Sequence, residues 1–279
     1  IFDDEPAAEY LAAGCTAMAN TDAETMEAYP YTVGMAVAQI VRDNTVVAQY
    51  GTLAAAIADA QTGDTVQLLT DVSATAVVEI TKSIILDGNG HNLNTSATRA
   101  IWIDAGNVDV TVKNLTILAN ANLERAIQVN NNCNNVTLTI DTVTATATYY
   151  AINVCDGASN LCLTITNSTI TGWAAVNAWG SNGNISIGDS ELTGLNNKSY
   201  RQSNSFGVIV IEGDTTGQTD MAADTITVLV KNTTITSKST TGNKQYVILY
   251  NNPNVNNAIT LEGCAIVLDG DETSFFNDS

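Results

Sequence analysis

The chain has few basic residues and little charge of either sign. Its 279 residues include 10 lysines and arginines against 29 aspartates and glutamates, so the net charge is −19 at pH 7. Affinity for nucleic acid depends on basic side chains that neutralise phosphates, so this balance excludes nucleic acid and anionic membrane surfaces as partners. Charged residues make up only 14 % of the chain. The surface must therefore be covered by Thr, Ser and Asn, which suit strands and turns better than helices.

Long apolar runs are also absent. No stretch reaches the roughly 18 apolar residues that a membrane-spanning helix needs. The first residues, Ile-Phe-Asp-Asp-Glu, form neither a basic n-region nor an apolar h-region, so we expect a mature or trimmed chain. No cofactor is expected. Ca²⁺ is the one ion that so acidic a chain could take, although no carboxylate run is dense enough to form a calcium loop by itself.

The five cysteines do not form a metal-binding pattern, because no Cys-x-x-Cys occurs. Their number is odd, so at least one is unpaired. We expect most of them to be buried, inert thiols. The alternatives are a bridge from Cys133 to Cys155 or from Cys155 to Cys162.

A sequence motif with apolar residues at alternate positions recurs along the chain with a period of about 25 residues. Its first half starts at residues 84, 110, 138, 163, 185, 228 and 259, and its second half at 100, 126, 151, 175, 207 and 246. The alternation is that of strands, and a unit this short cannot bury an apolar face without stacking on copies of itself. The repeat predicts an all-β parallel solenoid of about eight coils over residues 33–279.

Residues 1–32 lie outside the repeat and are expected to form an N-terminal extension. Pro6 after three acidic residues favours a helix over about 6–19. Residues 31–47 alternate as strands do, with a break at 42–44. Thr52 can cap a short helix that buries Leu53, Ala56, Ile57 and Ala60, which would cover the open end of the first coil.

Two neighbouring segments resemble a known group of proteins. They are YGTLAAAIADAQTGDTVQLLTD over residues 50–71 and ITKSIILDGNGH over residues 80–91. They resemble the opening of right-handed parallel β-helix proteins of the pectate-lyase-like group, many of which are bacterial secreted or surface proteins. The resemblance covers about residues 33–268. It implies the fold alone, because that fold hosts lyases, hydrolases, adhesins and structural proteins.

Aligning the repeats predicts two outward rows rich in threonine and one row of turn residues. The outward rows are 111, 139, 164, 186, 229 and 260, then 116, 144, 169, 191, 234 and 265. The turn row contains Asn114, Asn167, Asp189 and Asn232, which suit left-handed backbone. Solvent-facing threonine is an ordinary strand residue. The alternative is a flat face that binds ice or polysaccharide.

A catalytic member of this fold would need clustered charge. Asp141 and Asp189 are the best candidates, as outward carboxylates two coils apart, but no basic residue in a matching row stands between them. His91 is the single histidine and lies in a turn. Among the few aromatic residues, Tyr149, Trp173, Trp179 and Tyr200 are candidates for stacking on sugar rings, with packing beneath longer loops as the alternative. Insertions at about 194–206 and 212–224 widen that side.

We therefore expect a non-catalytic, extracellular structural or adhesive protein of a bacterial surface. Its expected partners are a surface polysaccharide or other copies of itself. The N-terminal segment of residues 1–32, with the strand-like residues 31–39, could supply a strand that joins copies into filaments. The alternatives are a polysaccharide lyase or hydrolase, and a solenoid that binds carbohydrate or ice.

Overall fold

A computed structural model describes most of the chain. The described residues are 2, 4–7, 14–19, 27–28, 31–119, 124–155, 157–179, 181–196, 205–212, 226–239, 244–251, 258–270 and 273–276. Among them β-strands dominate, and one helix occurs, α1 (Leu53–Asp59). In this part of the chain no helix is long and apolar enough to cross a membrane. The all-β class predicted from the repeat is confirmed.

The largest sheet has 16 strands. Ten of them follow one another in the order β24 (Ala258–Glu262), β21 (Ile226–Lys231), β18 (Ser181–Gly188), β15 (Ser159–Thr166), β13 (Val136–Ala147), β11 (Val108–Ala119), β8 (Ile85–Asp87), β5 (Thr65–Leu68), β3 (Ala38–Arg42) and β4 (Thr45–Tyr50). From β5 to β24 every pairing is parallel.

The other six strands of this sheet lie beyond a bend in the chain. They are β6 (Val72–Ala74), β9 (Asn92–Thr95), β16 (Thr169–Gly172), β19 (Glu191–Asn196), β22 (Thr234–Ser239) and β25 (Ala265–Asp269). β11 and β13 cross the bend as single strands, so β11 pairs with both β8 and β9, and β13 pairs with both β15 and β16.

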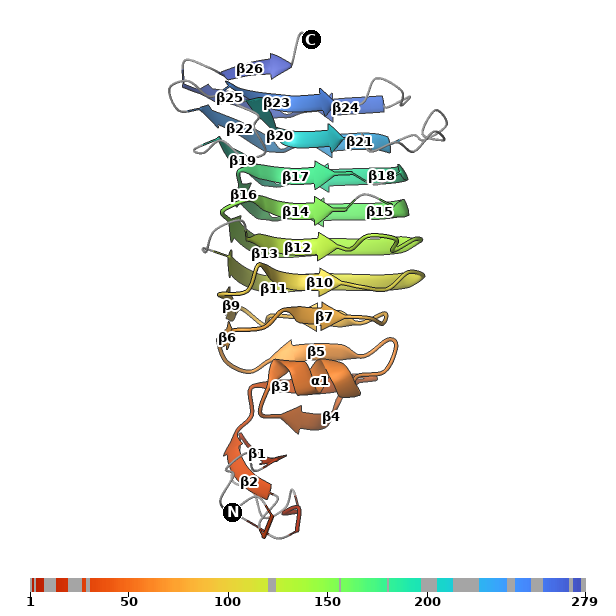
Figure 1. The fold of residues 1–279 in the computed structure, drawn as a ribbon, viewed down its shortest axis with the longest axis vertical. Coiled ribbons are helices and arrows are strands. Elements are labelled where there is room, and N and C mark those ends of the chain that lie inside the picture. Colours follow the sequence, from red (N-terminus) through yellow and green to blue (C-terminus); the bar gives the residue numbers. More distant parts are fainter. Residues whose placement is uncertain are drawn as a thin grey trace.

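An eight-stranded parallel sheet faces the bent sheet. Its strands are β26 (Thr273–Phe276), β23 (Lys244–Asn251), β20 (Ser205–Glu212), β17 (Ala174–Ala178), β14 (Tyr150–Val154), β12 (Arg125–Val129), β10 (Arg99–Ile103) and β7 (Val78–Ile80). Figure 1 shows the result as layers stacked along the long axis, with the N-terminus at one end and the C-terminus at the other. From β15 onward each layer has three strands, such as β15, β16 and β17.

The core is a set of apolar rows that run from layer to layer. One such row consists of Val112, Ile140, Ile165, Ile187 and Val230, each at most 1 % exposed. Within β13 the burial alternates between buried and accessible positions, and the irregularity falls at the bend. Because successive strand residues point to opposite faces, each repeat supplies one residue to each row. The inward positions predicted from the alternation are confirmed.

The N-terminal end is closed by α1 and a β-hairpin. Thr52 caps α1 by accepting a hydrogen bond at its side-chain oxygen from Ala55 N at 3.2 Å, and Leu53, Ala56 and Ile57 are buried, as the sequence predicts. β3 and β4 pair antiparallel through a turn at Asp43 and Asn44, both of which have positive φ. This hairpin coincides with the predicted break at 42–44.

The predicted helix over about 6–19 is wrong at its C-terminal end. β1 (Cys15–Ala19) is a strand that pairs antiparallel with β2 (Tyr31–Met35), because β2 offers it an edge that outweighs a weak helical pattern. Residues 8–13 lie outside the described residues. The predicted assembly strand over 31–39 divides into β2 and the start of β3, and both pair within the chain. β2 also spans the predicted boundary at residue 32.

Candidate functional site

The bend of the large sheet is made by one left-handed residue in each layer. Asn114, Asn167 and Asn232 have φ of 50°, 51° and 47°, and Asp189 has φ of 48°. Asn and Asp tolerate this conformation better than other residues with a Cβ. The predicted row of turn residues is confirmed. Thr142 occupies the same position in β13 with φ of 56° and is the β-branched exception.

Side chains near the bend bind one another from layer to layer. Asn114 Nδ2 donates to Asp87 Oδ1 at 3.1 Å, Asn167 Nδ2 donates to Asp141 Oδ1 at 2.8 Å, and Asn232 Nδ2 donates to Asp189 Oδ1 at 3.3 Å. Each carboxylate therefore accepts an amide hydrogen bond from the next layer.

Asp141 and Asp189 both belong to this ladder. Asp141 also accepts a hydrogen bond from Thr166 Oγ1 at 2.9 Å, and its bonds to Asn167 and Thr166 lower the pKa of its carboxyl group. A carboxylate kept ionised in this way is a poor proton donor, and no basic side chain lies between the two aspartates in their rows. His91 Nδ1 lies 3.4 Å from Asp71 Oδ1, a different carboxylate. Each of the two candidate catalytic residues thus accepts a hydrogen bond from an asparagine of the next layer.

No carboxylate cluster suited to a metal ion is present in the described part of the chain. Groups of three or more His, Cys, Asp or Glu side chains that could share an ion are absent from it. The described residues therefore offer no group of ligands for Ca²⁺.

The two predicted outward rows exist with the predicted membership. Registers between neighbouring strands place Thr111, Thr139, Thr164, Ser186, Leu229 and Thr260 in one row, before the bend. They place Thr116, Thr144, Thr169, Glu191, Thr234 and Ala265 in the other, after the bend. The bend separates the rows, so they face different directions.

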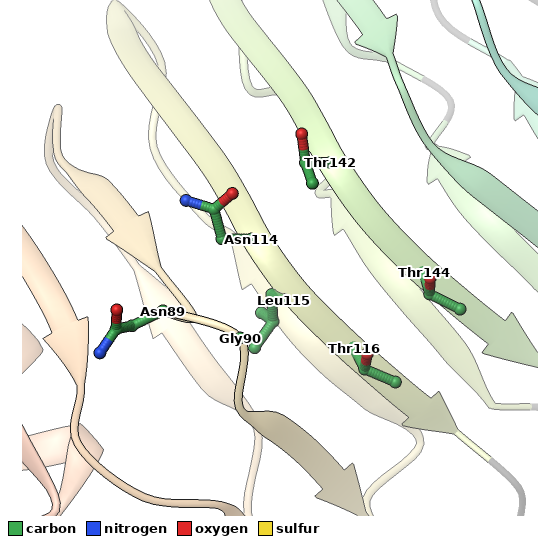
Figure 2. A pocket seen from close by; sticks show the side chains of 7 residues that line it. All are labelled: Asn89, Gly90, Asn114, Leu115, Thr116, Thr142 and Thr144. Carbon is green, nitrogen blue, oxygen red and sulfur yellow. The ribbon is translucent and has the colours of Figure 1, made fainter.

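Two pockets open along the bend, on the side of the second row. The lower pocket has a volume of about 300 Å³, and Figure 2 shows how the Asn89–Gly90 turn, β11 and β13 contribute to it. Its lining residues are Asn89, Gly90, Asn114, Leu115, Thr116, Thr142 and Thr144. The upper pocket has a volume of about 460 Å³ and is lined by Asn167, Ser168, Thr169, Asp189, Ser190, Glu191, Asn232 and Thr234.

The two pockets are consecutive segments of one surface, which we call the bend groove. Both are lined by the left-handed row and by the second outward row, and Thr144 of the lower pocket pairs with Thr169 of the upper one. From Asn114 to Asn232 the groove climbs four layers, about 19 Å at a strand spacing of about 4.8 Å. Asn and Thr side chains supply both donors and acceptors along it, and Asp189 and Glu191 add acceptors at its upper end.

Two lysines next to the groove form ion pairs with acidic side chains. Lys113 Nζ lies 3.6 Å from Asp87 Oδ2, and Lys231 Nζ lies 2.8 Å from Glu262 Oε2. Lys113 and Lys231 therefore do not create a positive groove. Its polar lining suits an uncharged, hydroxyl-rich ligand better than an anionic one.

Tyr149 and Trp173 do not form an exposed platform, so the expectation that they stack on sugar rings is wrong. Tyr149 and Trp173 are equivalent in adjacent layers and stack with ring centroids 5.1 Å apart, but they are only 2 % and 1 % exposed. They pack with Tyr150, whose hydroxyl is 3.0 Å from that of Tyr149. Trp179 is partly exposed and lies outside this cluster. Tyr200 lies outside the described residues, as do most residues of both insertions.

A second left-handed asparagine row escaped the sequence analysis. Asn107, Asn135, Asn160 and Asn182 have φ between 54° and 58°, and each stands near the start of a first strand. Asn135 Nδ2 donates to Asn107 Oδ1 at 2.8 Å, and Asn160 Nδ2 donates to Asn135 Oδ1 at 3.0 Å. The signal was an asparagine recurring at the same place in each repeat.

The cysteines are all free thiols, so neither alternative bridge is present. Cys133 and Cys155 are buried, as expected, and burial raises the pKa of the Cys133 thiol. Cys162 is exposed, while Cys15 and Cys264 are partly exposed, so the expectation that most are buried is wrong.

Comparisons with known proteins add no further relationship. No family model, no curated protein and no solved structure matches the chain.

Proposed function

We propose that this protein is a right-handed parallel β-helix that adheres, without catalysis, to an uncharged polysaccharide at a bacterial surface. The observation that carries the proposal is the bend groove, a polar channel that repeats the same kinds of side chain in every layer. Its repeat is about 4.8 Å, close to the length of one sugar ring along a polysaccharide chain.

Three features support the β-helix. Equivalent strands pair in parallel from layer to layer, each later layer has three strands, and a continuous core runs between the two sheets. Crossovers between parallel strands are right-handed in about 98 % of cases, which supports that hand. The surface location rests on the resemblance of residues 50–91 to secreted members of this fold.

The lining of the groove favours neutral sugars. Amide and hydroxyl groups of Asn114, Thr116 and Thr144 can bind sugar hydroxyls in either direction, and Asp189 and Glu191 accept from them. Carboxylates in the groove would repel a uronic acid. Since no aromatic side chain among the described residues lines either pocket, each sugar is bound weakly, and affinity grows with the number of sugars engaged.

A polysaccharide lyase or hydrolase is the second candidate. It would work through Asp141 and Asp189, so it predicts release of unsaturated or reducing sugars that Asp141→Ala together with Asp189→Ala abolishes. The ladder bonds of both carboxylates favour the non-catalytic function. An ice-binding face is not favoured, because Leu229 and Glu191 interrupt the two outward rows.

Affinity electrophoresis tests the proposal directly. The protein is run through gels that contain a β-glucan, a mannan, a xylan or, for comparison, pectate. We expect at least one neutral polysaccharide to retard it and pectate to have no effect. The variant Thr116→Val with Thr144→Val should lose most of that retardation, because it removes two groove hydroxyls while keeping the side-chain shape.

The matched control is Thr111→Val with Thr139→Val, which changes the same strands on the other side of the bend. This control should bind as the wild type does. Retardation by pectate alone, or equal loss in both double variants, would contradict the proposal.

A further inference from the structure

Large exposed apolar side chains gather at the two ends of the stack. Among the described residues they are Phe2, Met35, Val46, Val47, Val267 and Leu268. The first four belong to the N-terminal end and the last two to β25 in the final layer (Figure 1). The described residues along the long sides include none, so apolar exposure marks the ends as interaction surfaces.

The last described layer is less covered than the layer below it. In the described chain β24, β25 and β26 each pair on one side only. Their core residues Ile259, Leu261 and Ile266 are partly exposed, whereas Val228, Val230 and Ile235 in the layer below are at most 2 % exposed. Within the described chain, this layer therefore presents both open strand edges and partly exposed core rows.

The N-terminal end presents one edge strand of a kind that invites pairing. Among the described strands β4 pairs with β3 alone, and its sequence TVVAQY has no charge and no proline. Val46 and Val47 are each 48 % exposed. An uncharged, β-prone segment of this length at an exposed edge readily pairs with another strand.

The two ends match in direction and register. β4 is antiparallel to β3, which is antiparallel to β5, so β4 runs in the same direction as β5 and every later strand up to β24. Continuing the rows would put Ala48 of a second copy against Leu261, and Gln49 against Glu262. Gln49 already begins this row, since its Nε2 donates to Gln39 Oε1 at 3.3 Å.

We propose that copies of this chain stack head to tail, with β24 of one copy pairing in parallel with β4 of the next. The contact uses two different surfaces and does not close, so it generates a filament. The folded edge β4 is the joining strand, in place of a strand donated by residues 1–32. Thr16 Oγ1 donates to Gln49 O at 2.9 Å, so β1 lies beside β4 and must move aside for stacking. This inference does not rest on polysaccharide binding.

Blocking each end separately tests the proposal. Val47→Lys places a charge on the N-terminal edge, and Leu268→Lys places one on the C-terminal end. Sedimentation velocity and electron microscopy of the full chain should show concentration-dependent filaments for the wild type and monomers for either variant alone. An equimolar mixture of the two variants should form dimers and nothing longer, because one intact end of each kind remains.

The side-surface variant Thr139→Lys adds the same charge away from both ends and should form filaments as the wild type does. Wild-type monomers at every concentration would overturn the proposal. Dimers of Val47→Lys alone would also overturn it, because they would show a symmetric contact between two C-terminal ends. Retention in polysaccharide gels is measured in parallel, so loss of assembly and loss of sugar binding are distinguished.

Discussion

At the scale of single residues, the bend depends on which side chains tolerate left-handed backbone. The row that makes the bend holds asparagine or aspartate in most layers and Thr142 in one. This conformation costs a residue with a Cβ roughly 1–2 kcal/mol, and the cost is smaller for Asn because its side chain can form a local hydrogen bond. Comparing the repeats within the chain identified the asparagines. It did not identify Thr142, because threonine is an ordinary residue in a strand.

Replacing Thr142 by asparagine should stabilise the protein. We expect Thr142→Asn to raise the free energy of unfolding by about 1 kcal/mol, since it relieves a β-branched residue at positive φ. Urea denaturation measures the change. Thr144→Asn, two residues along the same strand, is the control and should not stabilise. A lower midpoint for Thr142→Asn would contradict the role given to this row.

Asp141 should make stability depend on pH in the acid range. Its hydrogen bonds from Asn167 and Thr166 lower the pKa of its carboxyl group in the folded protein. A lowered folded pKa contributes stability above the unfolded value of about 3.9, and this contribution is lost as pH falls through the folded pKa. Asp141→Asn keeps the shape and removes the charge. The wild type should therefore exceed the variant in unfolding free energy near neutral pH, and the gap should shrink on acidification.

At the scale of elements, three strands of the eight-stranded sheet share a buried ladder of amides. Asn153 Nδ2 donates to Gln128 Oε1 at 3.1 Å, and Asn177 Nδ2 donates to Asn153 Oδ1 at 2.9 Å. All three side chains are at most 3 % exposed. The ladder ends at Asn177, whose Oδ1 is buried without a partner, because the next layer has Val210 in this row.

Breaking the ladder in the middle should cost more than shortening it. Asn153→Val leaves the oxygen of Gln128 and the amide of Asn177 unpaired, and each buried unpaired group costs about 1–3 kcal/mol. Asn177→Val leaves one group unpaired and removes an oxygen that already lacks a partner. We expect the unfolding free energy to fall clearly more for Asn153→Val. Equal losses in chemical denaturation would show that the ladder does not act as a unit.

Sequence reasoning succeeded for the elements that repeat. Inward and outward rows follow from strand alternation, because a shift of one residue would move the whole set of apolar residues from the inward rows to the outward rows. It failed for β1, where pairing with β2 decides the structure and no repeat guides the choice. It also misplaced Tyr149 and Trp173. Their equivalence in neighbouring layers was visible, but their burial depends on packing with Tyr150, Val210 and Leu249.

At the scale of the whole molecule, the polar and the apolar surfaces lie apart, and the two proposals assign a different contact to each. The long sides carry threonine and asparagine, with a groove along one bend, and the ends carry the exposed apolar residues. A stack of copies would present one such groove per molecule along the filament. Weak binding at each sugar would then add up along a filament.

The dependence of affinity on sugar-chain length tests the central claim most directly. Isothermal titration calorimetry would use a series of neutral oligosaccharides, from one sugar to chains longer than the groove, drawn from the polysaccharide that retards the protein. We predict affinity that rises with each added sugar until the chain spans about 19 Å, at about four layers of about 4.8 Å, and then levels off. No sugar should be cleaved. Affinity that is independent of chain length, or unchanged by Thr116→Val with Thr144→Val, would contradict the account.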